Sequence, residues 1–330
     1  MTNVAREYVL LDANDEAIAV GQLKTRPLAQ TVGSQQIRVA TDTNAHRHLL
    51  VPSGGSKVRP DSGAVGISID SHPMIVDGQT VDFVDVHCQL PHLGGVFVRF
   101  AQDILDRLAE DPEDPPAVCR RTLAEWRAFL KNVGKPIGRE LVEGIIGELT
   151  VLGRLGANNP AAAVEAWEGP DKALHDFACA NAHLEVKATA SIDGKVVSIS
   201  NLDQLDPAGS ELSLAVVHLG EDGSAPGIDE TVDGLVAKGF PRHALLTKVN
   251  AAGYIAGSGA DADYRYRVRS VRLWRVGDDF PGLRRSHIPE GHLKGVERVR
   301  YELNLDTAAE RLDDDAAAQF LAGWIKAEGV

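Results

Sequence analysis

The segment FACANAHLEVKATA, residues 177–190, carries two charged side chains one residue apart in an otherwise apolar strand. Its pattern predicts two short β-strands joined by a two-residue turn at Asn181–Ala182. Because side chains alternate along a strand, one face of the hairpin would be wholly apolar. Glu185 and Lys187 would lie on the opposite face, where a solvated surface and a functional site both account for them.

A third charge is predicted on the same face. With the turn at Asn181–Ala182, Asp176 on the first strand would face Lys187 on the second, beside Glu185. The alternative is an ordinary cross-strand ion pair on a wet surface. A three-residue turn would send the charges to different faces, so the interpretation depends on the turn.

A long amphipathic helix is predicted over residues 136–156, ahead of this hairpin. Glu148 follows Ile145 by three residues and precedes Leu152 by four, which places its carboxylate within the apolar stripe. A buried carboxylate needs a metal, a cation or hydrogen-bond donors. Alternatively, Glu148 lies at the edge of the stripe and reaches water. With Asp176, Glu185 and Lys187 it would supply oxygen ligands for Mg²⁺ and an ammonium that orients water for phosphodiester hydrolysis.

Four segments in order resemble the motifs of a bacterial family of PD-(D/E)xK-motif proteins. They are GIIGELTVL (144–152), AWEGPDKALHDF (166–177), LEVKAT (184–189) and ISNLDQL (199–205). The family is similar in length to this chain. It belongs to the PD-(D/E)xK nuclease superfamily, which implies a restriction-endonuclease-like fold and a Mg²⁺-dependent nuclease, with Mn²⁺ as a substitute.

The resemblance also implies roles for individual residues. Asp176 and Glu185 would be the main metal ligands, and the Val186 carbonyl would be a third. Lys187 would orient the attacking water. Glu148 would be a further ligand or an acid next to the ligands.

The chain departs from the motif in one respect, because Asp176 follows His175 and not proline. A literal Pro-Asp pair stands at Pro170–Asp171. We prefer Asp176 because the hairpin brings it to Glu185, and we retain Asp171 as the alternative ligand. His175 and Gln204 are accessory candidates, although Gln204 is equally well explained as a loop residue.

A basic segment stands out in an acidic chain whose net charge is −13. Residues 240–301 contain 12 Lys and Arg against 6 Asp and Glu. Within it, Arg265, Arg267 and Arg269 would share one face of a strand and could contact a phosphate backbone. An edge strand protected by charge is the alternative.

The predicted fold is α/β, with a restriction-endonuclease-like core of a mixed sheet flanked by helices over residues 116–225. A β-rich region would precede it (1–115), and an α+β region with the basic segment would follow (226–330). In the first region, VDFVDVHCQL (81–90) and GGVFVRF (94–100) are predicted strands. His46 and His48 have no further ligands at zinc spacing, so we expect isolated surface histidines.

Together these features predict a DNA endonuclease, and the resemblance implies a place in a restriction or phage-defence system. The resemblance implies DNA as substrate and ATPases and DNA methyltransferases as companions, and a homodimer stays open. The alternatives are a non-catalytic nucleic-acid-binding or assembly subunit, and a scaffold. Three widely spaced cysteines and the lack of a leader or a membrane-length apolar run predict a cytoplasmic protein with no membrane partner.

Overall fold

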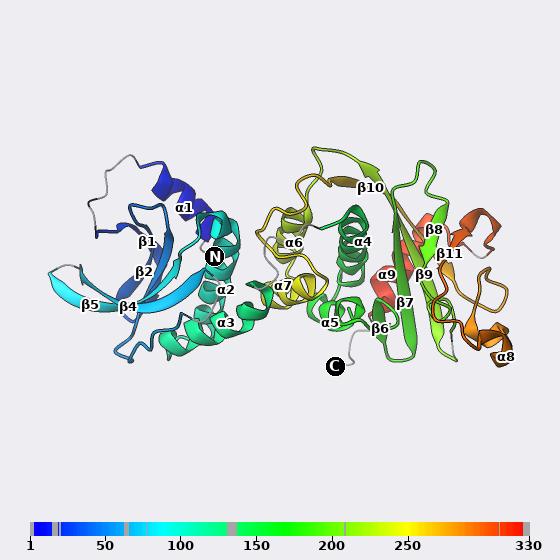
Figure 1. The fold of residues 1–330 in the computed structure, drawn as a ribbon, viewed down its shortest axis with the longest axis horizontal. Coiled ribbons are helices and arrows are strands. Elements are labelled where there is room, and N and C mark those ends of the chain that lie inside the picture. The colour runs from blue at the N-terminus through cyan, green and yellow to red at the C-terminus, as the bar shows by residue number, and fades with distance from the viewer. Residues whose placement is uncertain are drawn as a thin grey trace. The chain divides into compact units, whose positions relative to one another are not determined.

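In the computed structural model the chain forms two compact units (Figure 1). The first comprises Met1–Lys135 and Ile255–Gly259, and the second comprises Pro136–Tyr254 and Ala260–Val330. The structure describes residues 3–14, 19, 21–62, 66–76, 78–130, 137–207, 209–309 and 311–325. The five residues 255–259 therefore leave the second unit and join the first before the chain returns.

The first unit is a five-stranded antiparallel sheet with helices on one face. The strand order is β1-β2-β3-β5-β4. Leu49 on β3 and Val86 on β5 are fully buried on the face that packs toward α2 and α3. Its elements are α1 (Val4–Asp12), β1 (Lys24–Val32), β2 (Gln35–Thr41), β3 (Arg47–Pro52), β4 (Ile67–Val76), β5 (Gln79–Cys88), η1 (Pro91–Leu93), α2 (Gly94–Glu110) and α3 (Pro115–Leu130).

The segment GGVFVRF, predicted as a strand, is the first half of helix α2, so that prediction is wrong. Val96, Phe97 and Phe100 are buried at three- and four-residue spacing, and Ile104 continues the same stripe. The short apolar run could be either a strand or a helix, and its continuation into the helical pattern of 101–110 decides for the helix.

The second unit is built on a four-stranded mixed sheet of order β10-β9-β7-β6. Strands β7 and β9 are parallel, and both outer pairs are antiparallel. The elements are α4 (Arg139–Leu155), α5 (Pro160–Glu165), η2 (Gly169–Asp171), β6 (Phe177–Cys179), β7 (Ala182–Thr189), β8 (Val196–Ile199), β9 (Glu211–Glu221), α6 (Ile228–Ala237), α7 (Arg242–Ala251), β10 (Tyr266–Arg275), η3 (Arg285–His287), α8 (Glu290–Leu293), β11 (Tyr301–Asn304), η4 (Leu305–Thr307) and α9 (Asp314–Trp324).

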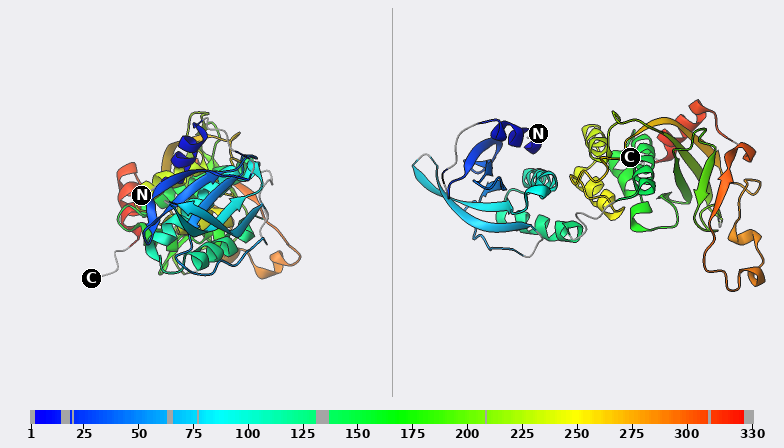
Figure 2. Two further views of the ribbon diagram at one scale, coloured as in Figure 1. Left: turned by 90° about the vertical axis from the view of Figure 1, so that its left-hand side faces the viewer. Right: turned by 45° about the horizontal axis from the view of Figure 1, so that its top comes forward.

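Different layers cover the two faces of this sheet, as Figures 1 and 2 show. Helix α4 lies on one face, and the two-stranded β8-β11 sheet lies beyond the other. Leu212 and Leu214 of β9 pack with Val197 of β8 and Leu303 of β11 in a buried cluster. The sheet therefore has an apolar layer on both faces, as a central sheet requires.

The predicted α/β class with a mixed central sheet flanked by helices is confirmed. Nine α-helices and three sheets occur in the described parts of the chain. Among those same residues, no helix has both the length and the apolar character needed to cross a bilayer.

Candidate active site

Helix α4 approaches β7 closely because Gly147 has no side chain at the contact. A Cβ on Gly147 would lie only 2.9 Å from the Cβ of Ala188. Buried Ile145 and Leu152 hold the same region of the helix in the core. Glu148, the residue after Gly147, is thereby held against the sheet and not in open solvent.

The hairpin turns one residue earlier than predicted. Cys179 pairs with Ala182, so the turn residues are Ala180 and Asn181, and Ala180 adopts a left-handed φ of 52°. Because the turn still has two residues, the side chains that were predicted to share a face of the hairpin still share it. Continuing the register places Asp176 opposite Glu185. The predicted pairing of Asp176 with Lys187 is therefore wrong, while the shared face of the charges is retained.

Asp176 is fixed by backbone N–H donors from two segments. Its Oδ2 accepts a hydrogen bond from the Val186 N–H over 2.7 Å. Its carbonyl accepts from the N–H groups of Glu168 and Gly169. Both oxygens of the side chain are thus set in direction before any ligand binds.

Gly169 leaves a small space between two carboxylates. A Cβ built there would lie 2.7 Å from Oδ1 of Asp176 and 3.0 Å from Oε2 of Glu148. Both oxygens therefore lie within 3.0 Å of a single point, which any side chain at residue 169 would occupy. Asp176 thus meets Glu148 at Gly169 and meets Glu185 across the hairpin.

The Lys187 ammonium lies 2.6 Å from Oε1 of Glu185. The Glu185 side chain is 2% exposed and the Lys187 side chain 16% exposed, so the ion pair lies inside the protein. Ala188 faces α4, so the alternating Glu185 and Lys187 project from the other face of β7. A buried ion pair of this kind lowers stability unless further charged or hydrogen-bonding groups compensate for the lost solvation.

The site brings three carboxyl groups, those of Glu148, Asp176 and Glu185, near the Lys187 ammonium. Burial and then the Asp176 carboxylate raise the pKa of Glu185 to about 8, against the opposing effect of Lys187. Burial and then Asp176 also raise the pKa of Glu148 to about 8. Burial raises the pKa of Asp176 as well, although Lys187 and the Val186 N–H act in the opposite direction. Burial acts to lower the pKa of Lys187, but Glu185 and the other carboxylates raise it overall.

Residues 4–306 match a family described as "Putative PD-(D/E)XK family member (DUF4420)". The chain belongs to the DUF4420 family. All four motif segments lie within the matched range. No curated protein and no solved structure matches the chain.

Two residues of this DUF4420 site were not predicted from the sequence. One is Gly169, and the other is Trp167, whose Nε1–H donates to Oε2 of Glu148 over 2.7 Å. Trp167 is fully buried and stacks on Phe177, with ring centroids 6.4 Å apart. A buried indole N–H requires an acceptor. Trp167 and Gly169 both lie in the segment AWEGPDKALHDF, on either side of Glu168, so the tryptophan in this motif was the available signal in the sequence.

The alternative ligand Asp171 lies outside the cluster in this DUF4420 chain. Its Oδ2 forms an ion pair with the Lys248 ammonium at 2.6 Å, and its side chain is 59% exposed. Lys248 also donates to the Trp167 carbonyl. The literal Pro-Asp pair therefore fastens η2 to helix α7.

The accessory candidates take different positions in the DUF4420 fold. Oε1 of Gln204 accepts from the Ser200 N–H over 2.8 Å, which is a loop contact. His175 is buried and its ring lies 5.1 Å from that of His183. Burial and then His183 and Lys187 lower the pKa of His175, against a hydrogen bond to the Gln204 backbone. The charge of Lys187 thus acts on His175, whereas the Gln204 amide oxygen accepts a hydrogen bond within its own loop.

Two of the three arginines, Arg267 and Arg269, belong to strand β10. Arg265 precedes β10, and the register of β10 shifts between Val268 and Ser270, around Arg269. Arg265 forms an ion pair with Glu230 at 3.0 Å, and Arg267 forms one with Asp222 at 2.6 Å. Binding of nucleic acid by these arginines stays a prediction.

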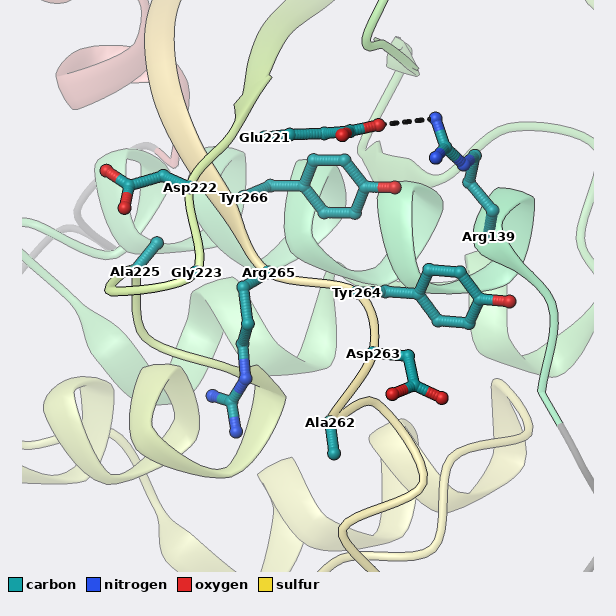
Figure 3. Close-up of a pocket in the computed structure, with 10 residues that line it drawn as sticks. All are labelled: Arg139, Glu221, Asp222, Gly223, Ala225, Ala262, Asp263, Tyr264, Arg265 and Tyr266. Carbon is teal, nitrogen blue, oxygen red and sulfur yellow. Dashed lines mark ion pairs between the residues drawn. The ribbon is translucent and has the colours of Figure 1, made fainter.

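A cavity of about 490 Å³ opens beside Arg265 in the second unit. Figure 3 shows the rings of Tyr264 and Tyr266 along it, with Arg139 paired to Glu221 at its rim. Glu221 ends β9, seven residues beyond the Leu214 that pairs with Glu185. This cavity is therefore distinct from the carboxylate cluster of the DUF4420 site.

Proposed function

We propose that the chain is a Mg²⁺-dependent DNA endonuclease that hydrolyses phosphodiester bonds. The observation that carries the proposal is the position of Asp176, which meets Glu148 at Gly169 and meets Glu185 across the hairpin. Lys187 adds the ammonium next to these acids. Membership of a family described as PD-(D/E)XK supports the same reaction class.

The donor set suits a hard divalent cation. Mg²⁺ prefers carboxylate oxygens, usually one or two of them with water and substrate phosphate completing the shell. Asp176 and Glu185 would hold the ion, with Glu148 and the Val186 carbonyl as further candidates. The glycine at 169 leaves space beside two of the carboxyl groups. The raised pKa values of Glu148 and Glu185 fit a site in which Lys187 alone does not balance the carboxyl groups. Mn²⁺ would suit the same oxygens.

The chain's own residues would supply positioning and proton transfer. When bound, a divalent cation would neutralise developing charge on the phosphate and acidify a water ligand. The Lys187 ammonium, 2.6 Å from Glu185, would donate to the attacking water or to a phosphate oxygen. The Val186 N–H holds Oδ2 of Asp176, which leaves Oδ1 directed toward Glu148. The Trp167 indole N–H holds the Glu148 carboxylate in a fixed position.

A second candidate is a non-catalytic nucleic-acid-binding or assembly subunit on the same fold. The ion pairs of Arg265 and Arg267 with acidic neighbours and the net charge of −13 favour protein partners over a bare phosphate backbone. We further propose a place in a restriction or phage-defence system with DNA as substrate. ATPase and methyltransferase components would be its companions.

The test is cleavage of duplex and single-stranded DNA with Mg²⁺ or Mn²⁺ by the unaltered protein, Asp176→Asn and Lys187→Ala. We expect both variants to lose at least about 100-fold in rate. Robust cleavage by both would reject the site. If the unaltered protein cleaves no nucleic acid even with its partners added, the binding-subunit function is the one supported.

A further inference from the structure

The first unit contains a second polar cluster, which is built on the five-stranded sheet. His48 on β3 lies directly opposite His87 on β5, and Asp85 lies two residues before His87 on the same side of β5. One ligand atom from each of the three lies within 4.8 Å of the others. No other such group of three occurs in the parts of the chain that the structure describes.

His48 is not the isolated surface histidine that we expected from the sequence, so that prediction is wrong. His48 is 7% exposed and Asp85 is 6% exposed. The pairing of β3 with β5 brings His48 to His87, with ring centroids 5.3 Å apart. Asp85 and His87 were not predicted as site residues, because the pairing of β3 with β5 that brings them to His48 is not visible in the sequence.

Each histidine has one nitrogen held by a neighbour and one without a partner. Nδ1 of His48 lies 2.9 Å from Oδ1 of Asp85, and Nε2 of His87 lies 2.9 Å from the Ser68 hydroxyl. The remaining nitrogens, Nε2 of His48 and Nδ1 of His87, are buried without a hydrogen-bond partner. Buried polar atoms without partners are uncommon in folded proteins.

This arrangement is typical of metal-ligating histidines. In such sites one ring nitrogen binds the ion, and the other is bonded to a group that fixes the ring, as the Ser68 hydroxyl does for His87. Two imidazoles and one carboxylate favour zinc and related transition metals over Mg²⁺, which prefers oxygen ligands. Three protein ligands leave a further coordination position, and the His72 imidazole lies 3.9 Å from Asp85 on the adjacent strand.

We propose that His48, Asp85 and His87 form a zinc-class metal site in the first unit. It differs in chemistry from the carboxylate cluster of the second unit, and it stands whether or not that cluster cleaves DNA. The neighbouring His46 does not belong to it, because its Nδ1 binds Asp42 at 2.9 Å.

The test uses the full chain with Asp176→Asn and Glu185→Gln, so that the second unit contributes little binding. The protein is stripped with EDTA, desalted and titrated with Zn²⁺, and bound metal is measured by mass spectrometry. We expect about one Zn²⁺ per chain, and a loss of about 100-fold or more in affinity on His87→Ala. His46→Ala is the matched control and should bind as before.

Cobalt gives a second measurement that does not depend on variants folding. Co²⁺ added to the stripped protein should give visible absorption bands of a site with nitrogen ligands, and excess Zn²⁺ but not Mg²⁺ should remove them. Less than about 0.1 equivalent of Zn²⁺, absent cobalt bands, or equal losses for His46→Ala and His87→Ala would each overturn the proposal.

Discussion

The indole N–H of Trp167 holds the carboxylate of Glu148 at 2.7 Å, which links the segment before β6 to helix α4. Trp167 is itself fixed, because it is fully buried and stacks on Phe177. A residue without charge therefore positions an acid of the candidate site. It also lowers the pKa of that acid, since the hydrogen bond favours the ionised form.

Trp167→Phe should separate this positioning role from the fold. The ring stacking on Phe177 is kept, but the hydrogen bond to Glu148 is lost, which we expect to cost about 10-fold in cleavage rate. Because the pKa of Glu148 then rises, the acidic limb of the pH–rate profile should move to higher pH. An unmoved pH profile with the same loss in rate would indicate a packing defect alone.

Gly169→Ala should block the site with little change elsewhere. The new Cβ would lie 2.7 Å from Asp176 and 3.0 Å from Glu148, so we expect weaker Mg²⁺ binding and a loss in rate of about 100-fold. Gly144→Ala is the matched control, because no atom lies within 4 Å of its Cβ position. That control should keep its activity and gain up to about 1 kcal/mol in stability, as expected for alanine in a helix. Equal rates for the two variants would contradict the proposed geometry.

Stability without metal should fall as the pH rises. Glu148 and Glu185 have pKa values of about 8 in the folded protein, whereas exposed glutamate titrates near pH ~4.3. Between these values the folded protein holds protons that the unfolded chain has released. The free energy of unfolding should therefore fall from pH 5 to 8, by on the order of 1 kcal/mol per pH unit for each of the two glutamates.

Urea unfolding in EDTA at several pH values measures this slope. Glu185→Gln should reduce the slope by about half, because the amide does not titrate while Glu148 still does. An identical slope in the variant would show that other groups cause the pH dependence.

Lys187→Met should divide catalysis from metal binding. The ammonium competes with a metal ion for Glu185, so its removal should leave Mg²⁺ affinity unchanged or raise it several-fold, while cleavage is lost. Calorimetric titration with Mg²⁺ measures the affinity, and Asp176→Asn serves as the comparison that loses binding. Parallel loss of Mg²⁺ binding in both variants would assign Lys187 a structural role only.

Asp171→Asn tests the literal Pro-Asp pair. Asp171 is half exposed and bound to Lys248, so we expect full cleavage activity and a loss of at most about 1 kcal/mol in stability. Thermal unfolding and cleavage assays beside Asp176→Asn measure the difference. If Asp171→Asn lost activity as Asp176→Asn is expected to, the choice between the two aspartates would be reversed.

The sequence predicted the elements of the core and the set of charges, because both follow from periodicity. Alternation in β7 placed Glu185 and Lys187 on one face, and the apolar stripe of α4 placed Glu148 inward. The position of the turn was missed because Ala180 adopts a left-handed conformation that alanine rarely takes. Periodicity gave no sign of this.

Contacts between distant segments could not be predicted in the same way. The Trp167 hydrogen bond, the space at Gly169 and the meeting of His48 with His87 depend on which strand or loop lies next to which. A single sequence carries no pairing information for such contacts. The literal Pro-Asp motif was also misleading. Pro170–Asp171 matches it in sequence, but Asp176 is the aspartate that lies beside Glu148 and accepts from the Val186 N–H.

The short excursion Ile255–Gly259 makes the two units difficult to dissect genetically. Ile255 and Ala256 are buried, and a Cβ at Gly257, where φ is +81°, would press on the Gly95 backbone. Removing residues 1–135 would strip these five residues of their surroundings and expose apolar side chains in the remaining chain. Loss of function in such a deletion could therefore reflect a damaged second unit, so point substitutions will assign roles more cleanly than truncations.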